Sequence, residues 1–404
     1  MATYEYKNLK EKYGEFEGMV VVIKIDDKDL GDPKKGFPVS DLYVDLTSGY
    51  EASIAEFTIY DSYDVSTSSF SSNSQLTKYT KLGSKVQIAT GYGTNATVIF
   101  QGAIMRVNYY FNDNDIPGVR ITAMDVKGIM MSSTYSRQLT ATSYSDAVKE
   151  ILEKSVYTTM QSKGIIESIN VSDTPDKQSS GVGSVYGDEA TDSIGSISGT
   201  SGLSGENKET DRTIEMVAES DYEFIVKAAK RYNYEFFTEC GNVYFRKAKS
   251  DATTRMVITP NTGMYNFDVS YDITGLVNKV TVRATDAAKA QVIEAAQKNQ
   301  GNLPSKAKSL IKGNEKVYVD ASVTSKEEAE YRAQSLMESV SYRFGSLECE
   351  MQGMPEYLPG YFFELSGLGD GIDNVFYINR VVHRVTTQGK YLVKLEGKAA
   401  ETKE

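Results

Sequence analysis

The sequence has one histidine, two cysteines and no tryptophan among its 404 residues. With His383 alone, no second imidazole is available for a zinc site or a two-histidine iron site. A Ser-His-Asp triad would also have to use His383, yet no GxSxG motif precedes a helix. Cys240 and Cys349 lie far apart in strand-like sequence, which excludes a multi-bridge disulfide framework and a CxxC metal motif. We therefore expect no cofactor and no metal, and we interpret His383 as an ordinary strand or interface residue.

The sequence also lacks a surplus of basic charge and any long apolar run. Its formal net charge is −11, whereas phosphate binding needs Lys and Arg gathered on one face. No stretch approaches the roughly 20 apolar residues of a membrane span, and residues 1–18 contain no apolar segment of the secretory kind. We expect synthesis in the bacterial cytoplasm, no direct nucleic-acid sequence recognition and no stable membrane insertion.

Two motifs of ligand-binding type are incomplete. Residues 91–96 match GxGxxA, but they join two strand-like segments and open no helix that could hold a pyrophosphate. Residues 112–115 are rich in Asn and Asp, but the Gly and distant Glu of a calcium loop do not follow. The 55 acidic residues leave a paired-carboxylate glycosidase open. The 28 tyrosines are interpreted mainly as core or subunit-interface residues.

What is present divides the chain into three parts. Residues 19–130 read as strands with Gly-rich turns, which predicts a small antiparallel β-barrel or sandwich as the first domain, residues 1–130. Residues 131–255 predict an α+β module: a helix over 146–154 with Ser145 as its N-cap, a second helix that begins after residues 219–221, and then a hairpin. Within this module the Ser- and Gly-rich composition of residues 172–211 predicts a flexible loop. The fold class expected is therefore mainly β with an α+β insert.

Residues 256–404 return to strands. A largely helical insertion is predicted over residues 287–312. A further helix is predicted to start at Ser325, because Glu328 follows at the spacing of a capping box. Residues 347–398 are again strand-rich. We expect this part to form a second β-barrel domain.

An internal repeat is the most informative pattern. The segment that begins at Gly83 aligns without a gap on the segment that begins at Gly360, and the turn between the two strands is expected to have the same length in both copies. An alternating strand precedes each hairpin, over 54–60 and 347–351, and a returning strand follows, over 119–123 and 391–395. The repeat positions are Gly83, Val86, Ile88, Phe100, Gly102 and Ile104 in one copy, and Gly360, Phe363, Leu365, Tyr377, Val381 and His383 in the other.

Two similar barrels in one chain have a consequence for symmetry. Three copies in a closed trimer would present six similar barrels around one axis. Such a ring can contact a six-fold tube on one side and a three-fold object on the other.

Several segments resemble one known family. They are residues 219–237 with the hairpin that runs on to 247, the capped helix around 327–333, the Leu-Pro-Gly turn at 358–360, and residues 377–383. Together and in this order they resemble the late-control D family of contractile phage tails, which includes baseplate hubs and the hub part of the type VI secretion spike protein VgrG.

The resemblance implies two barrels of the tail-tube kind and a homotrimeric baseplate hub, without enzymatic activity, that joins the hexameric tail tube to the central spike. Its partners would be the tail tube protein, a spike protein and the baseplate wedge proteins, in a virion or an extracellular phage-tail-like particle. Because the sequence departs from the pattern by ending soon after the last strand, we expect the spike to be a separate polypeptide. The loop at 172–211 is longer than the pattern. A tail-associated cell-wall hydrolase and a receptor- or carbohydrate-binding tail-tip protein remain the alternatives.

Overall fold

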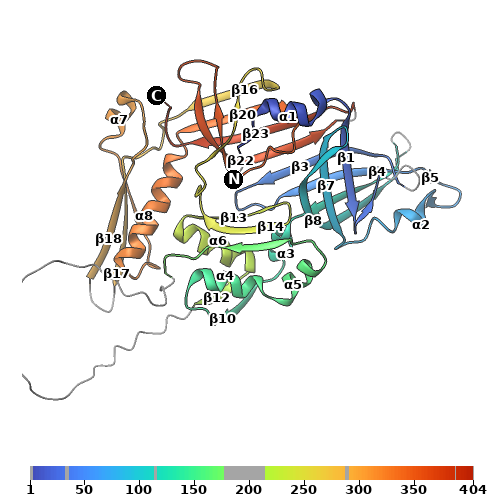
Figure 1. Ribbon diagram of the computed structural model, residues 1–404. Helices are drawn as coiled ribbons and strands as arrows, with labels where there is room; N and C mark the ends of the chain where they lie inside the picture. The colour runs from blue at the N-terminus through green and yellow to red at the C-terminus, as the bar shows by residue number, and fades with distance from the viewer. Residues whose placement is uncertain are drawn as a thin grey trace, which may run out of the picture.

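A computed structural model describes residues 3–31, 36–112, 116–176, 214–286, 291–386 and 388–403. The protein is mainly β with an α+β insert, as the sequence predicted, and most of its strands belong to one large antiparallel sheet. In Figure 1 the blue strands from the N-terminal part and the red strands from the C-terminal part meet where β3 and β22 lie side by side. Residues 177–211 of the predicted loop lie outside the described residues.

The N-terminal part contains seven strands of this sheet and a few short elements outside it. The sheet strands are β1 (Met19–Ile25), β2 (Lys28–Asp29), β3 (Val39–Thr47), β4 (Ile54–Tyr60), β7 (Lys85–Tyr92), β8 (Asn95–Tyr110) and β9 (Gly118–Met124). Before and between them lie α1 (Tyr6–Lys12), the 3-10 turn η1 (Gly14–Phe16), the pair β5 (Tyr63–Asp64) and β6 (Ser69–Phe70), and α2 (Asn73–Leu76).

The middle module lies against one side of the sheet (Figure 1). Its elements are α3 (Val126–Met130), β10 (Tyr135–Gln138), α4 (Tyr144–Leu152), α5 (Ser155–Ser162), β11 (Ser168–Val171), β12 (Glu215–Glu219), α6 (Asp221–Tyr232), β13 (Tyr234–Glu239) and β14 (Asn242–Lys247). The N-cap of α4 is Ser143, whose hydroxyl accepts the N–H of Asp146, so the prediction of Ser145 was wrong by two residues. Ser220 caps α6 in a full capping box with Glu223, and the helix ends at the left-handed Asn233.

The C-terminal part contributes the remaining strands of the large sheet and a projecting unit. Its elements are β15 (Thr254–Ile258), β16 (Met264–Tyr271), β17 (Lys279–Asp286), β18 (Gln291–Lys298), α7 (Ser305–Ile311), β19 (Glu315–Val319), α8 (Lys326–Ser341), β20 (Gly345–Gln352), β21 (Tyr361–Leu365), β22 (Asn374–Val385) and β23 (Tyr391–Ala399). Strands β18, β17 and β19 form a separate sheet that packs on α8.

Two predictions for the C-terminal part need correction. The helical insertion expected over 287–312 is helical only at α7, because residues 291–298 pair with β17 as strand β18; residues 287–290 lie outside the described residues. This stretch has no strict alternation, and Ala295 and Ala296 favour a helix locally, but pairing with β17 overrides helix propensity. At α8 the hydroxyl of Ser325 accepts the N–H of Glu328 as predicted, but the Glu328 carboxylate accepts from Thr324 instead.

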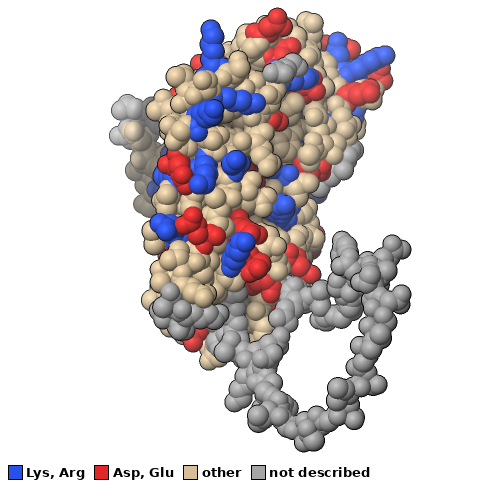
Figure 2. All heavy atoms as spheres, turned by 90° about the vertical axis from the view of Figure 1, so that its left-hand side faces the viewer, with Lys and Arg blue, Asp and Glu red and all other residues tan. Residues whose placement is uncertain are grey.

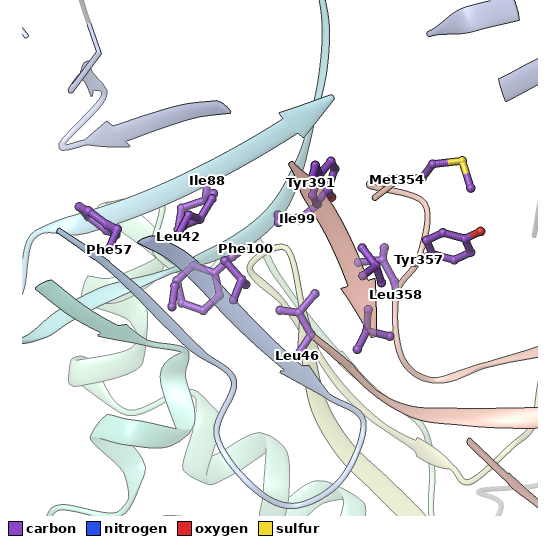
Figure 3. Packing of buried hydrophobic residues seen from close by; sticks show 14 of the residues in the cluster. Leu42, Leu46, Phe57, Ile88, Ile99, Phe100, Met354, Tyr357, Leu358 and Tyr391 are labelled. Atoms are coloured by element: carbon purple, nitrogen blue, oxygen red, sulfur yellow. The ribbon is translucent and has the colours of Figure 1, made fainter. Parts of the chain in front are cut away.

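The main core is shared between the N-terminal and C-terminal parts. One contiguous cluster of buried apolar side chains includes Leu42 and Leu46 of β3 together with Tyr357, Leu358 and Tyr391 from the other end of the chain. Figure 3 shows these side chains side by side between the strands of the two parts. Burying apolar surface across the junction stabilises the two parts as one body.

Candidate assembly surface

The junction between the two parts is a strand pairing. β22 runs antiparallel to β3, with Arg380 opposite Thr47 and Val385 opposite Leu42. The ladder continues one residue further, since the N–H of Ser48 donates to the carbonyl of Asn379 at 3.0 Å. We call this pairing of β3 with β22 the internal seam. It joins two sets of strands that would otherwise each end in an open edge, so that one 13-stranded sheet runs through both parts of the described chain.

The two sets of strands share one connectivity. In the N-terminal part the order across the sheet is β3, β4, β9, β8, β7, and in the C-terminal part it is β16, β20, β23, β22, β21. Each set contains a hairpin, which is β7 with β8 or β21 with β22. The returning strand, β9 or β23, lies beside the hairpin, followed by the alternating strand, β4 or β20, and by one outermost strand. The outermost strand β3 thus corresponds to β16, and the second hairpin strand β8 corresponds to β22.

The correspondence extends to single residues. Reading across the register, Val44 pairs with Ala55, which pairs with Ala123, which pairs with Ile104. The same reading in the other set gives Val269, Leu347, Gly397 and Ile378. The last residue of each row accepts a hydrogen bond from the glycine that precedes the hairpin. The N–H of Gly83 donates to the carbonyl of Ile104, and the N–H of Gly360 donates to the carbonyl of Ile378, each at 2.8 Å.

A β-bulge follows each row at the same place. The pairing with the returning strand shifts between Ile104 and Arg106 in β8, and between Ile378 and Arg380 in β22. A bulge adds one residue to one strand and bends it. Arg106 therefore corresponds to Arg380.

The predicted repeat positions lie in these two hairpins. Gly83 and Gly360 both have positive φ, at 78° and 92°, a backbone conformation that favours glycine. Register matches Val86 with Phe363 and Ile88 with Leu365, and all four side chains are buried. In the second strand the gapless alignment is displaced by three residues: Phe100 corresponds to Asn374, Gly102 to Phe376 and Ile104 to Ile378. Tyr377, Val381 and His383 are buried in β22, but they correspond to residues of β8 other than those that the gapless alignment gives.

The turn explains this displacement. β7 and β8 keep their ladder up to Tyr92 and Asn95, so Gly93 and Thr94 alone form the turn. β21 and β22 part at Leu365 and Asn374, and the loop between them is held by the Asp373 carboxylate, which accepts the N–H groups of Gly367 and Leu368. The expectation of turns of equal length was therefore wrong, because the ladder is longer in one copy.

His383 lies in the internal seam opposite Val44, and none of its surface is exposed. Its Nε2 is 2.9 Å from the carbonyl of Tyr357, which can only accept, so Nε2 carries the proton. Its Nδ1 then accepts from the Tyr391 hydroxyl at 2.7 Å, and that hydroxyl lies 2.8 Å from Thr90 Oγ1. Burial lowers the pKa of His383 to about 4, so the ring is neutral and structural near pH 7.

The α+β module is fastened to the second hairpin by a buried ion pair. Arg246 of β14 donates from Nε to Glu235 of β13 at 2.6 Å and from Nη2 to the carbonyl of Gly360 at 2.9 Å. The Tyr377 hydroxyl donates to the other oxygen of Glu235. Burial raises the pKa of Glu235, and Arg246 opposes that shift. The contact fixes the module against β21 and β22.

The described residues include no cluster of metal-binding type. No group of three or more His, Cys, Asp or Glu side chains there could hold a metal ion. None of the described helices has both the length and the apolar character required to cross a bilayer. On the face that carries α7, β17 and β18, Figure 2 shows Lys and Arg interspersed with Asp and Glu, so no single-sign field forms on this face.

Comparison with protein families gives one match. The model of the family described as Alg8 N-terminal domain matches residues 169–387, just over half of the chain. None of the curated proteins compared with the sequence matches it.

Solved structures with the same fold include two tail proteins and a type VI secretion component. The tail protein from Neisseria meningitidis MC58 superimposes with a TM-score of 0.60 at 12% identity, covering 95% of this chain and 97% of that one. The 43 kDa tail protein of prophage MuSo2 from Shewanella oneidensis gives 0.60 at 12% identity, covering 95% and 99%. The Escherichia coli c3393 protein, described as a type VI secretion component structurally similar to the T4 phage tail proteins gp27 and gp5, gives 0.53 at 10% identity, covering 95% and 78%. The chain therefore has the fold of these tail proteins.

Proposed function

The chain belongs to the Alg8 N-terminal domain family, and we propose that it is the central baseplate hub of a contractile phage tail or phage-tail-like injection system. In this role it is a structural homotrimer without catalytic activity that joins the hexameric tail tube to a separately encoded spike. The resemblance to the late-control D family, carried by residues 219–247, 327–333, 358–360 and 377–383, is part of the same proposal.

One observation carries it: a single chain contains two strand sets of the same connectivity, matched residue by residue through Ile104 and Ile378. A subunit that holds two similar units can offer six similar surfaces in a trimer. That is the geometry required of a part that mediates between six-fold and three-fold symmetry. The shared fold with tail proteins supports the same role.

The division of labour within the chain follows from this geometry. We assign the tube contact to the two barrel-like domains, at about residues 1–130 and 256–404, because they carry the repeat. The module between them, residues 131–255, occurs once per chain. In a trimer it is present three times, which suits contacts with the spike or with wedge proteins.

Electron microscopy of the purified chain tests the proposal. The expected particle is a three-fold ring with an axial channel and six similar lobes, and it should bind the purified tail-tube protein end-on. A chain that stays monomeric at high concentration contradicts the proposal.

The same preparation separates the alternatives. Clearing on a peptidoglycan gel that disappears on substitution of a single carboxylate would indicate a cell-wall hydrolase. Specific glycan binding by the isolated chain would indicate a receptor-binding tail-tip protein. The proposed hub predicts neither result.

A further inference from the structure

Among the strand edges of the large sheet that have no neighbouring strand in the described part of the chain, two are related by the repeat. One is β16, which pairs with β20 on one side only. The other is the C-terminal half of β8, from Arg106 onward, which pairs with β9 but has passed beyond the end of β7. An open edge carries unpaired backbone groups and is a template for another strand.

The internal seam shows what such an edge can bind. β22 corresponds to β8, and its C-terminal half also passes beyond its hairpin partner β21, yet there it pairs with β3. β3 corresponds to β16. The counterpart of the internal seam is therefore β8 paired with β16, and within the described chain that pairing is not made.

The surroundings of the two half-strands match as well. The segment before β7 approaches β8 where the Thr80 hydroxyl contacts the Tyr109 hydroxyl at 2.7 Å. The segment before β21 approaches β22 at the corresponding place, where the carbonyl of Tyr357 accepts from His383. Since the latter segment does not prevent β3 from pairing with β22, the former leaves room for a strand beside β8.

Side chains at the open edges have the character of a core. At the internal seam the buried positions include Val381, His383, Leu42, Val44 and Leu46. The corresponding residues at the two open edges are Val107, Tyr109, Phe267, Val269 and Tyr271, and all of them are apolar or aromatic. Yet Tyr109 is 49% and Phe267 is 39% exposed in the single chain, and the other three are half-buried. Apolar side chains in matched positions along two open edges favour burial against one another.

Backbone directions agree with this pairing. The N–H of Asp272 donates to the carbonyl of Phe344, toward the β20 side, so alternation directs the backbone groups of Val269 and Tyr271 to the open edge. The carbonyl of Asn379 accepts from Ser48 at the internal seam, and the corresponding alternation in β8 directs Val107 and Tyr109 outward. Arg106 then lies opposite Asp272, and both are exposed, so opposite charges face each other across the pair.

We propose that β16 of one copy pairs antiparallel with the C-terminal half of β8 of a second copy, with Val107 opposite Tyr271, Asn108 opposite Ser270 and Tyr109 opposite Val269. This pairing repeats the internal seam between molecules. Because the two edges lie on different strands, the contact is head-to-tail, and such contacts form a ring where the rotation closes. The inference gives the proposed hub its subunit interface and rests on that proposed function for the number of copies, three.

Cysteine cross-linking tests the register. Asn108 and Ser270 are exposed, and they correspond to Val382 and Asp45, which pair at the internal seam. Asn108→Cys with Ser270→Cys is expected to give covalent dimers and trimers on a non-reducing gel after mild oxidation. Each single variant and the wild-type chain, with its own Cys240 and Cys349, should stay at the mass of one chain.

Two further variants control for proximity and geometry. Asn108→Cys with Asn266→Cys places the second thiol four residues along the same exposed strand, and no cross-link is expected. Val382→Cys with Asp45→Cys should lose its two introduced thiols while staying at the mass of one chain, because that pair lies within the molecule.

The outcomes separate this inference from the proposed function. A trimer by sedimentation that does not cross-link through Asn108→Cys and Ser270→Cys overturns the strand pairing and leaves the hub in place. A chain that stays monomeric at high concentration overturns both. Cross-linking of the Asn266→Cys pair to the same extent as the Ser270→Cys pair also overturns the register.

Discussion

Asp45 of β3 accepts two hydrogen bonds from the guanidinium of Arg380 of β22, at 2.8 and 2.5 Å, across the internal seam. The two residues are separated by most of the chain, and their pairing fastens the N-terminal strand set to the C-terminal one. A two-point contact of this kind holds orientation as well as distance.

Asp45→Asn should weaken the internal seam. The Arg380 side chain is 42% exposed and Asp45 17%, so solvent screens the pair and the expected loss of unfolding free energy is about 1 kcal/mol. Urea denaturation measures it. The control is Glu348→Gln, which removes one of the two carboxylate partners of Lys394 from a more exposed pair and should cost less than about 0.5 kcal/mol. Equal losses from the two variants would contradict the role given to Asp45.

His383 should make stability depend on pH. Its folded pKa, about 4, lies below the unfolded value of about 6.5, so the unfolded state takes up the proton first. The contribution of the neutral ring is fully present above pH 6.5 and is lost as the pH falls toward 4, on the order of 3 kcal/mol in total.

The measurement for His383 is the unfolding free energy between pH 7.5 and 4. His383→Gln should be less stable at pH 7 but show a shallower decline over this range, since carboxylates alone remain to titrate. Arg384→His adds an exposed imidazole beside the seam as a control and should leave the slope unchanged. A wild-type slope that persists in His383→Gln would refute the prediction.

Gly360 and Gly83 occupy corresponding positions but should differ in their tolerance of alanine. Both have positive φ, which costs an L residue roughly 1 kcal/mol. A Cβ at Gly360 would also lie 3.2 Å from the Phe237 ring, whereas a Cβ at Gly83 would meet nothing within 4 Å. Gly360→Ala should therefore lower the thermal unfolding temperature more than Gly83→Ala. The reverse order would show that the module does not press on the second hairpin.

Glu235→Gln should destabilise the contact between the α+β module and β22. The substitution leaves the guanidinium of Arg246 without its carboxylate partner in a site where both side chains are about nine-tenths buried, and the expected loss is about 3 kcal/mol. Urea denaturation should show that Glu235→Gln with Arg246→Gln recovers part of it. Glu294→Gln, which removes the partner of Arg283 from a half-exposed pair, serves as the control and should have little effect.

Val269→Pro should block assembly without unfolding the chain. Its N–H points to the open edge of β16, and an edge strand tolerates proline where no ladder bond is lost. We expect a folded monomer by circular dichroism and sedimentation velocity. Ser270→Pro removes an N–H directed at β20 and should unfold the strand instead. Rings that persist in a folded Val269→Pro variant would argue against pairing through β16.

Local patterns in the sequence determined many of the strands and helix ends of this protein. Alternation of apolar and polar residues gave strands at 54–60 and 119–123, because a half-buried strand exposes every second residue. Ser220 and Glu223 specified the start of α6, since the capping interaction needs only residues three apart. The leading glycines Gly83 and Gly360 pointed to a repeat because positive φ is a local requirement.

Tertiary structure decided the rest, because strand pairing joins residues that no local pattern connects. Residues 291–298 became a strand when β17 lay beside them, and the hairpin turns took lengths that only the two ladders define. The internal seam and the open edges likewise depend on how far each strand runs past its neighbour. Tyr109 and Phe267 look like ordinary core residues in the sequence, and only the register of the folded sheet reveals that the single chain leaves them partly exposed.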